Sequence, residues 1–274
     1  MSDALAEALR AGHRLYDLSR PYVIGMPQSP NHPAYWHSLP RRHGDMVRGD
    51  GSSASNDIIV LGTHVGTHID ALAHVSHGGE LFGGVHAAEA QVGGRFSTLG
   101  IDTFEPRLAK GVLLDVPAAL ELDALEPARE ITPSDLERTV ERQGVAIGEG
   151  DVILVRSGWG ARWGEGIGYV GLQTGVPGVS EAGAVWLADH RPVAVGADSI
   201  AFECLEAGKG HSLLPAHRVL LVERGINIIE TLNLEELARD GVHDFTLVLA
   251  PLPLVGATGS PVRPLAIVGT GGSQ

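Results

Sequence analysis

Hydrophobic and polar positions along the chain follow strand-like and helix-like patterns in turn, as in a mixed α/β protein. Short apolar runs typical of strands cover residues 14–19, 57–69, 111–116, 151–156, 192–196, 227–230 and 244–250. Helix-like patterns cover residues 4–13, 132–142, 180–188, 217–221 and 234–238. Thr132 and Ser180 stand where N-caps are preferred. Because strands alternate with helices but also follow one another directly, the pattern predicts a mixed sheet in one domain, residues 1–274.

Two stretches lack a periodic pattern. Residues 22–56 are rich in proline and glycine, and residues 78–94 are studded with glycine. A long stretch of this kind is typically a functional lid or a mobile segment. The first stretch contains Tyr35 and Trp36, which either stack on a flat substrate or anchor local packing.

Composition narrows the class of protein. The 274-residue chain is 43% hydrophobic and 19% charged, as globular proteins are, and its formal charge of −13 disfavours nucleic acid and anionic membranes as partners. Cys204 is the only cysteine, so an intrachain disulfide is impossible, and we interpret it as a buried apolar residue. No signal peptide is evident, and the apolar run 245–254 is too short to span a membrane. A cytoplasmic location is expected.

The most informative segment is Thr-His-Val-Gly-Thr-His-Ile-Asp-Ala-Leu-Ala-His-Val-Ser-His, residues 63–77. In an extended chain His64, His68 and Asp70 point to one face, but the two imidazoles then lie about 13 Å apart. A bend at Gly66 would bring them together. Two imidazoles and a carboxylate suit Zn²⁺, Mn²⁺ or Fe²⁺ and leave positions open for water and substrate. The alternative is a polar strand face whose histidines hydrogen-bond locally.

This segment resembles the signature His-x-Gly-Thr-His-x-Asp-x-Pro-x-His of the cyclase or kynurenine-formamidase-like family of metal-dependent hydrolases. Residues 64–74 match it except at Leu72, which replaces the proline. Weaker similarities extend over most of the chain. They lie at residues 17–19, 25–27, 156–159, 196–199, 217–221 and 229–230.

The resemblance implies a swivelling β/β/α fold with a mixed, barrel-like sheet and peripheral helices. It implies that His64, His68 and Asp70 bind one metal ion and that His74 is the catalytic acid/base. His217 and Glu230 match the positions that hold a second ion in binuclear members. The implied cofactor is Zn²⁺ or Mn²⁺, one or two per chain, and the implied assembly is a homodimer or homotetramer.

The expected reaction is hydrolysis of a C–N bond in a small amide, arylformamide or lactam by metal-activated water. Ser29 replaces the tryptophan that stacks the substrate in kynurenine formamidases. Alternatives are a lactone hydrolase, a metal-dependent cyclase or dehydratase, and a metal-binding or ligand-binding protein without turnover. Arg156 either binds a substrate carboxylate or, as we prefer, pairs with an acidic residue. His77 is interpreted as a surface residue.

Overall fold

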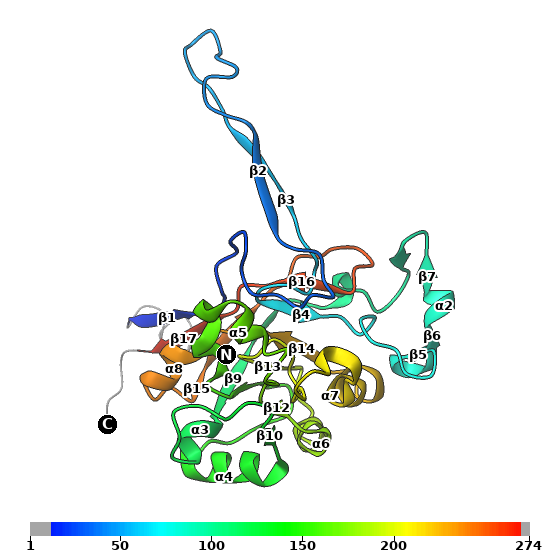
Figure 1. Ribbon diagram of the computed structural model, residues 1–274, viewed down its shortest axis with the longest axis vertical. Helices are drawn as coiled ribbons and strands as arrows, with labels where there is room; N and C mark the ends of the chain where they lie inside the picture. Colours follow the sequence, from blue (N-terminus) through cyan, green and yellow to red (C-terminus); the bar gives the residue numbers. More distant parts are fainter. Residues whose placement is uncertain (1–11, 270–274) are drawn as a thin grey trace.

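A nine-stranded mixed sheet forms the centre of the computed structural model, which describes residues 12–269 (Figure 1). The strands, in spatial order, are β1 (His13–Asp17), β17 (Leu265–Gly269), β15 (Asp244–Leu249), β9 (Arg107–Asp115), β11 (Val152–Arg156), β13 (Ala194–Ala197), β14 (Asn227–Glu230), β4 (His68–Asp70) and β16 (Gly259–Pro261). β9, β11, β13 and β14 are parallel, and the outer neighbours pair antiparallel. The sheet curls into a half-barrel, which confirms the predicted mixed, barrel-like fold.

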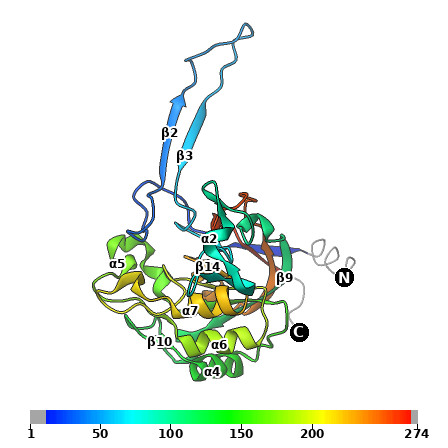
Figure 2. The same cartoon turned by 90° about the vertical axis from the view of Figure 1, so that its right-hand side faces the viewer.

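The parallel strands are buried on both faces, as their continuous apolar sequences predict. Alternate residues of one strand enter different cores: Val112 and Leu114 pack with α4 (Pro133–Gln143) and α6 (Glu181–Asp189). Leu113 packs on the opposite face with residues of β15 and of α8 (Glu235–Arg239). The helices α4 and α6 therefore cover one face of the sheet (Figure 2).

The predicted helix starts are confirmed. The Thr132 hydroxyl accepts from the Asp135 amide, and the Asp135 carboxylate accepts from the Thr132 amide, so the two residues form a capping box at α4. The Ser180 hydroxyl accepts from the Gly183 amide at the start of α6. Further short elements are α2 (Ala87–Ala90), α3 (Val116–Ala119), α5 (Ile167–Val170), α7 (Pro215–His217), β10 (Glu130–Ile131) and β12 (Gly178–Val179). The predicted helix over residues 217–221 is a π-helix over Arg218–Glu223 that continues from α7.

The single strand predicted over residues 57–69 is wrong. Residues 56–60 form β3, residues 63–67 form turns and bends, and only His68–Asp70 belong to β4. Gly66 has φ +61, and the ring of Tyr22 lies where a Cβ at this position would point. The β-branched residues on either side gave a strand pattern that the left-handed glycine interrupts.

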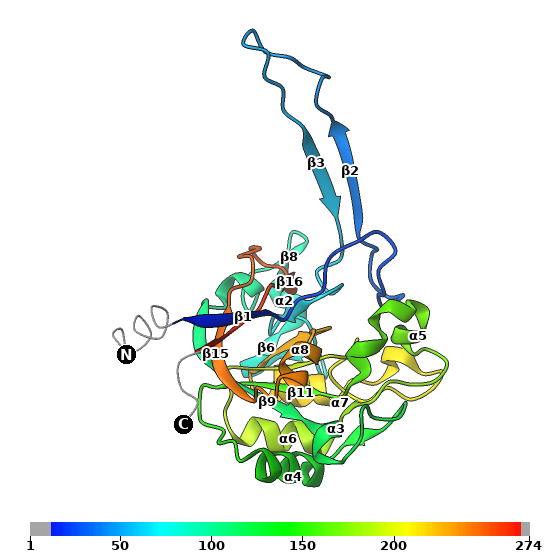
Figure 3. The same cartoon turned by 90° about the vertical axis from the view of Figure 1, so that its left-hand side faces the viewer.

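The non-periodic stretches also contain strands. β2 (Trp36–Arg41) pairs with β3 (Asn56–Val60) in a long antiparallel hairpin that projects from the body in all three views (Figures 1–3). Residues 80–96 fold into β5 (Glu80–Leu81), β6 (Val85–His86), β7 (Gln91–Val92) and β8 (Arg95–Phe96), with α2 between the two pairs. Strands this short, rich in exposed and glycine-flanked positions, leave no clear periodic pattern in the sequence, so the loop prediction was wrong here.

The helix predicted over residues 4–13 lies outside the described residues except at its end, where His13 begins β1. Across residues 12–269, every helix is too short or too polar to cross a membrane.

Candidate metal centre

The short strand β4 brings together the residues of the central motif. It pairs with β14 on one side, in a register that sets His68 opposite Glu230, and with β16 on the other side. Side chains of directly opposite residues are neighbours on the same face of a sheet. The strand pairing therefore places an imidazole and a carboxylate of distant sequence position side by side.

The backbone carbonyl of Gly66 orients the ring of His68. Its Nδ1 lies 2.8 Å from the carbonyl oxygen of Gly66, which fixes this nitrogen as the donor. Its Nε2 then faces the acids, 3.5 Å from Asp70 Oδ1 and 3.4 Å from Glu230 Oε2. The bend at Gly66 thus both redirects the chain and sets the tautomer of His68.

His64 lies on the turn before β4, and its Nδ1 is 2.7 Å from Asp70 Oδ1. Its other ring nitrogen lies 2.9 Å from Thr258 Oγ1. His74, on the turn after β4, stacks on His64 with 3.8 Å between ring centroids. Potential ligand atoms of His64, Asp70 and His74 lie within 4.8 Å of one another.

His217 enters the same cluster from α7. Its Nε2 lies 3.4 Å from Asp70 Oδ2 and 3.3 Å from Glu230 Oε1, and these three residues form a second close group of potential ligands. Glu203 contacts its Nδ1 and also accepts hydrogen bonds from the amides of Ala216 and His217. A carboxylate on the far nitrogen is the usual way in which metal-binding imidazoles are oriented.

The charges at this site are buried and predominantly negative. Asp70, Glu203 and Glu230 are at most 6% exposed. Burial alone would raise the pKa of Asp70, but His74, His64 and His217 outweigh it and hold this pKa well below the usual range. Burial likewise opposes protonation of His217, yet Glu203 and its other acidic neighbours hold its pKa well above the usual value. Three buried carboxylates create a strong demand for positive charge.

The residues present fit a divalent cation. Asp70 belongs to both close groups, and its Oδ2 is buried without a hydrogen-bond donor among the described residues. An acceptor oxygen in that state costs free energy unless a cation or another donor reaches it. Imidazole nitrogens and carboxylate oxygens without thiolates suit Zn²⁺ or Mn²⁺. The structure therefore supports a divalent metal and gathers His64, His68, Asp70, His74, His217 and Glu230 into one cluster.

His74 is partly buried beside the potential ligands. Burial, together with the charge of His64, lowers its pKa to about 3, although Asp70 opposes the shift. The imidazole is therefore neutral at neutral pH, and its acid/base role stays a prediction.

Sequence reasoning did not identify three neighbours of this cluster. Glu203 lies fourteen residues before its partner His217, and no motif marks it. His32 stands 5.4 Å from the ring of His64, and the Nδ1 of His211 lies 3.3 Å from the hydroxyl of Ser29. His32 and His64, like Ser29 and His211, are far apart in sequence, so their proximity depends on the fold.

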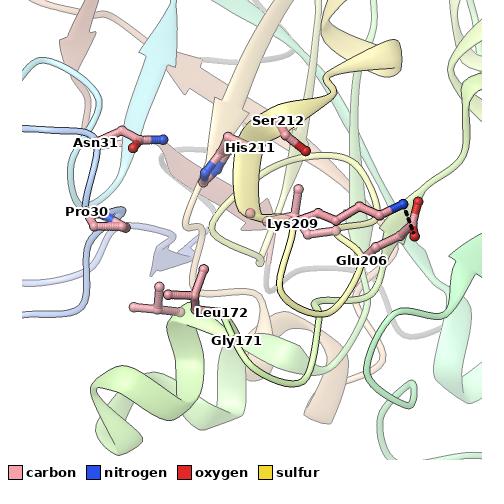
Figure 4. Close-up of a pocket in the computed structure, with 11 residues that line it drawn as sticks. Pro30, Asn31, Gly171, Leu172, Glu206, Lys209, His211 and Ser212 are labelled. Atoms are coloured by element: carbon pink, nitrogen blue, oxygen red, sulfur yellow. Dashed lines mark ion pairs between the residues drawn. The ribbon is translucent and has the colours of Figure 1, made fainter.

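A cavity of about 320 Å³ opens beside His211 (Figure 4). Pro30 and Asn31 line one side of it, and Leu172 lies on the opposite side from His211 in the close-up. The lining contains no phenylalanine, tyrosine or tryptophan. The loop that lines the cavity continues directly to His32, and therefore links the cavity to the imidazole cluster.

The remaining predicted residues lie elsewhere. Tyr35 packs edge-on against Tyr22, with 5.7 Å between ring centroids, and Trp36 begins β2 with half of its surface exposed. Their predicted contacts with substrate stay predictions. His77 is exposed, as expected, whereas Cys204 is only half-buried.

Arg156 is paired with acids, as we preferred. It lies 2.9 Å from Asp115 and 2.8 Å from Glu235. Asp198 belongs to another of the family-like segments, residues 196–199. Its carboxylate accepts hydrogen bonds from the amides of Ser157, Gly158 and Gly160 and so holds the loop after β11 in place.

Known proteins share this fold and parts of this sequence. The Cyclase family model matches residues 16–204. Isatin hydrolase from Roseibium aggregatum is 27% identical over 222 residues, which cover 80% of this chain and 77% of that protein. The crystal structure of a novel cyclase aligns with a TM-score of 0.83 and 28% identity, covering 97% of this chain and 93% of that one. A predicted metal-dependent hydrolase from Bacillus stearothermophilus aligns with a TM-score of 0.59 and 25% identity, covering 93% and 98%.

The fold, the relatives and the cluster of imidazoles and carboxylates identify this protein as an enzyme of the hydrolase class, with residues that suit a divalent metal. The chain belongs to the Cyclase family.

Proposed function

We propose that this enzyme hydrolyses the C–N bond of a small cyclic or linear amide, with a lactam or an arylformamide as substrate. The observation that carries the proposal is the cluster of imidazoles and carboxylates around the buried Asp70. The isatin hydrolase among the relatives acts on a lactam by name, which supports the C–N bond as the target.

His64, His68, Asp70, His217 and Glu230 would hold one or two ions of Zn²⁺ or Mn²⁺. Such an ion supplies a hydroxide nucleophile at neutral pH and polarises the substrate carbonyl. Hydrolysis adds hydroxyl to the carbonyl carbon, breaks the C–N bond and leaves a proton on the nitrogen. His74 accepts the proton released by the attacking water and delivers it to the departing nitrogen. Its stacking on His64 holds the ring beside the reacting groups.

The cavity beside His211 is the place we propose for the part of the substrate remote from the carbonyl. Its side chains are aliphatic and polar, so it favours a compact substrate over one that needs aromatic stacking. The absence of aromatic side chains from the cavity lining also favours a second candidate substrate, an aliphatic lactone. Its hydrolysis would use the same groups, with oxygen as the leaving atom.

The test combines metal analysis with turnover. The metal-reconstituted enzyme should hydrolyse isatin, an arylformamide or an aliphatic lactone, and the preferred compound will identify the bond cleaved. His74→Ala should keep its metal and lose turnover by about 10²–10⁴-fold, the usual contribution of a general acid or base. The matched control is His77→Ala, which alters an exposed imidazole and should leave turnover unchanged. Full turnover in His74→Ala would exclude the assigned role, and a chain that binds no divalent metal would exclude the proposal.

A further inference from the structure

The imidazole of His211 borders the cavity of about 320 Å³ beside the metal centre. In the close-up its ring extends toward the side where Pro30 and Asn31 lie (Figure 4). The loop that carries these two residues also carries His32, whose ring stands 5.4 Å from that of His64. His211 therefore faces the loop that connects the cavity with the metal centre.

A buried serine determines which ring nitrogen of His211 accepts a hydrogen bond. Ser29 is 3% exposed, and its Oγ lies 3.3 Å from the Nδ1 of His211. The same oxygen accepts a hydrogen bond from the amide of Asn31. Among the residues that the structure describes, Nδ1 is the only acceptor within reach of the Ser29 hydroxyl proton, and a buried donor without an acceptor is costly. Ser29 therefore donates to Nδ1.

This hydrogen bond leaves the other nitrogen of His211, Nε2, as a donor. Burial lowers the pKa of His211 below its ordinary value, although Glu230 at the metal centre opposes the shift, so the ring is neutral at neutral pH. A neutral imidazole carries one proton, and because Nδ1 accepts, that proton is on Nε2. Nε2 forms no hydrogen bond to any of residues 12–269, and the partly buried ring lines the cavity. A ligand in the cavity can therefore accept a hydrogen bond from Nε2.

We propose that His211 determines substrate specificity by donating this hydrogen bond to a second carbonyl oxygen of the substrate, remote from the carbon that is attacked. This inference rests on the proposed C–N hydrolysis and narrows its substrate to a compact aliphatic amide with two carbonyl groups, such as a cyclic imide. The cavity lining supplies no aromatic ring for stacking, so recognition depends on shape and hydrogen bonds. An uncharged oxygen suits the neutral donor, because the only lysine of the lining, Lys209, is already paired with Glu206 at 2.6 Å.

Two compounds with the same ring size test this assignment. Succinimide has two carbonyl groups, and 2-pyrrolidinone has one. Their binding to the Zn²⁺-loaded His74→Ala enzyme, which is expected not to turn them over, is measured by isothermal titration calorimetry. Adding His211→Leu should weaken the preference for succinimide by about 2–10-fold, the usual contribution of one neutral hydrogen bond. The comparison between the two enzymes cancels the difference in solvation between the two compounds.

Further variants in the same background distinguish hydrogen bonding from packing. His211→Gln keeps an N–H donor at the end of the side chain and should retain most of the preference for succinimide. Ser29→Ala removes the partner of Nδ1, so it should lower this preference while the metal content stays the same. Ser134→Ala, which removes an exposed hydroxyl from α4, is the matched control and should leave the preference unchanged.

Binding and turnover can fail independently in this experiment. An unchanged preference in His211→Leu, or no binding of succinimide to the Zn²⁺-loaded enzyme, would overturn the inference. Equal losses in His211→Leu and His211→Gln would indicate that the ring acts only by packing, and would overturn it as well. A preference that depends on His211, in an enzyme that retains His74 but hydrolyses neither compound, would support the contact and count against the proposed C–N hydrolysis.

Discussion

At the scale of single residues, the site is organised by what each imidazole does with its second nitrogen. His68 and His217 each use Nδ1 for a protein oxygen and turn Nε2 toward the acids. Gly66 provides that oxygen from the backbone, and Glu203 provides it from a side chain. A backbone acceptor cannot be removed by substitution, whereas the Glu203 carboxylate can.

Glu203→Gln is expected to weaken binding of the ion held through His217 by roughly 10–100-fold, the usual cost of losing an orienting partner. The amide keeps the size of the side chain but removes the charge that faces Nδ1. Competition with a chromogenic chelator measures the affinity directly. Glu206→Gln, an exposed acid three residues away, is the control. An unchanged affinity would show that Glu203 does not orient His217 toward metal.

The pH dependence of stability should report His32. Burial, with a smaller effect from His64, lowers its pKa to about 4 from the ordinary value of 6.5. Between about pH 4 and about pH 6.5 the unfolded chain therefore binds a proton that the folded chain does not. Folding stability must then fall as the pH is lowered through this range, and it is fully retained above it.

Urea unfolding of metal-free protein at about pH 7.5 and about pH 5 measures this effect. His32→Gln should lose less stability between the two values than the wild type, because glutamine does not titrate. His77→Gln, at an exposed position, should behave as the wild type does. Identical pH dependence of all three proteins would mean that His32 is not held neutral by the fold.

At the scale of helices and strands, the sequence predicted those elements whose signals lie within a few consecutive residues. The N-cap at Thr132 and the apolar runs of the core strands are local sequence signals, and both were predicted correctly. β16 and β17 were not predicted from the sequence. These short strands are stabilised by pairing with β4 and β15, which a local pattern does not show. The central motif predicted which residues gather, but the left-handed Gly66 divided the expected strand.

Arg156 connects two elements, since it links Asp115 at the end of β9 to Glu235 in α8. Asp115 is only 3% exposed. Arg156→Gln should therefore cost about 3 kcal/mol of unfolding free energy, because it leaves a buried carboxylate without its partner. Urea unfolding measures the loss, and KM should not change in the folded variant.

Arg162→Gln provides the comparison, since its pair with Glu165 is exposed and should contribute little to stability. A rise in KM for Arg156→Gln without any loss of stability would instead support the alternative in which Arg156 binds a substrate carboxylate.

At the scale of the whole molecule, the candidate site is assembled from segments that span most of the chain. His64 and Glu230 are separated by more than half of the sequence, and Thr258 contacts His64 from a third region. The family resemblance indicated His217 and Glu230, whereas spacing alone did not select them. Glu203, His32 and His211 had no such signal, because their roles depend on how the sheet curls and brings distant loops together.

The same assembly predicts that metal and global stability are coupled. Two buried carboxylates, Asp70 of β4 and Glu230 of β14, face the Nε2 of His217, and Glu203 lies behind this imidazole on its Nδ1. A bound cation therefore offsets the cost of burying these charges, which otherwise lowers the stability of the whole fold. An ion present at one hundred times its dissociation constant should add about 2.7 kcal/mol to the unfolding free energy. Exhaustive chelation should therefore lower the melting temperature, and added Zn²⁺ or Mn²⁺ should restore it. Asp70→Asn removes the oxygen shared by both groups and should abolish most of this metal-dependent increment, whereas Asp57→Asn, on the exposed strand β3, should preserve it. A melting temperature that is the same with and without metal in the wild-type protein would contradict a cation at this centre.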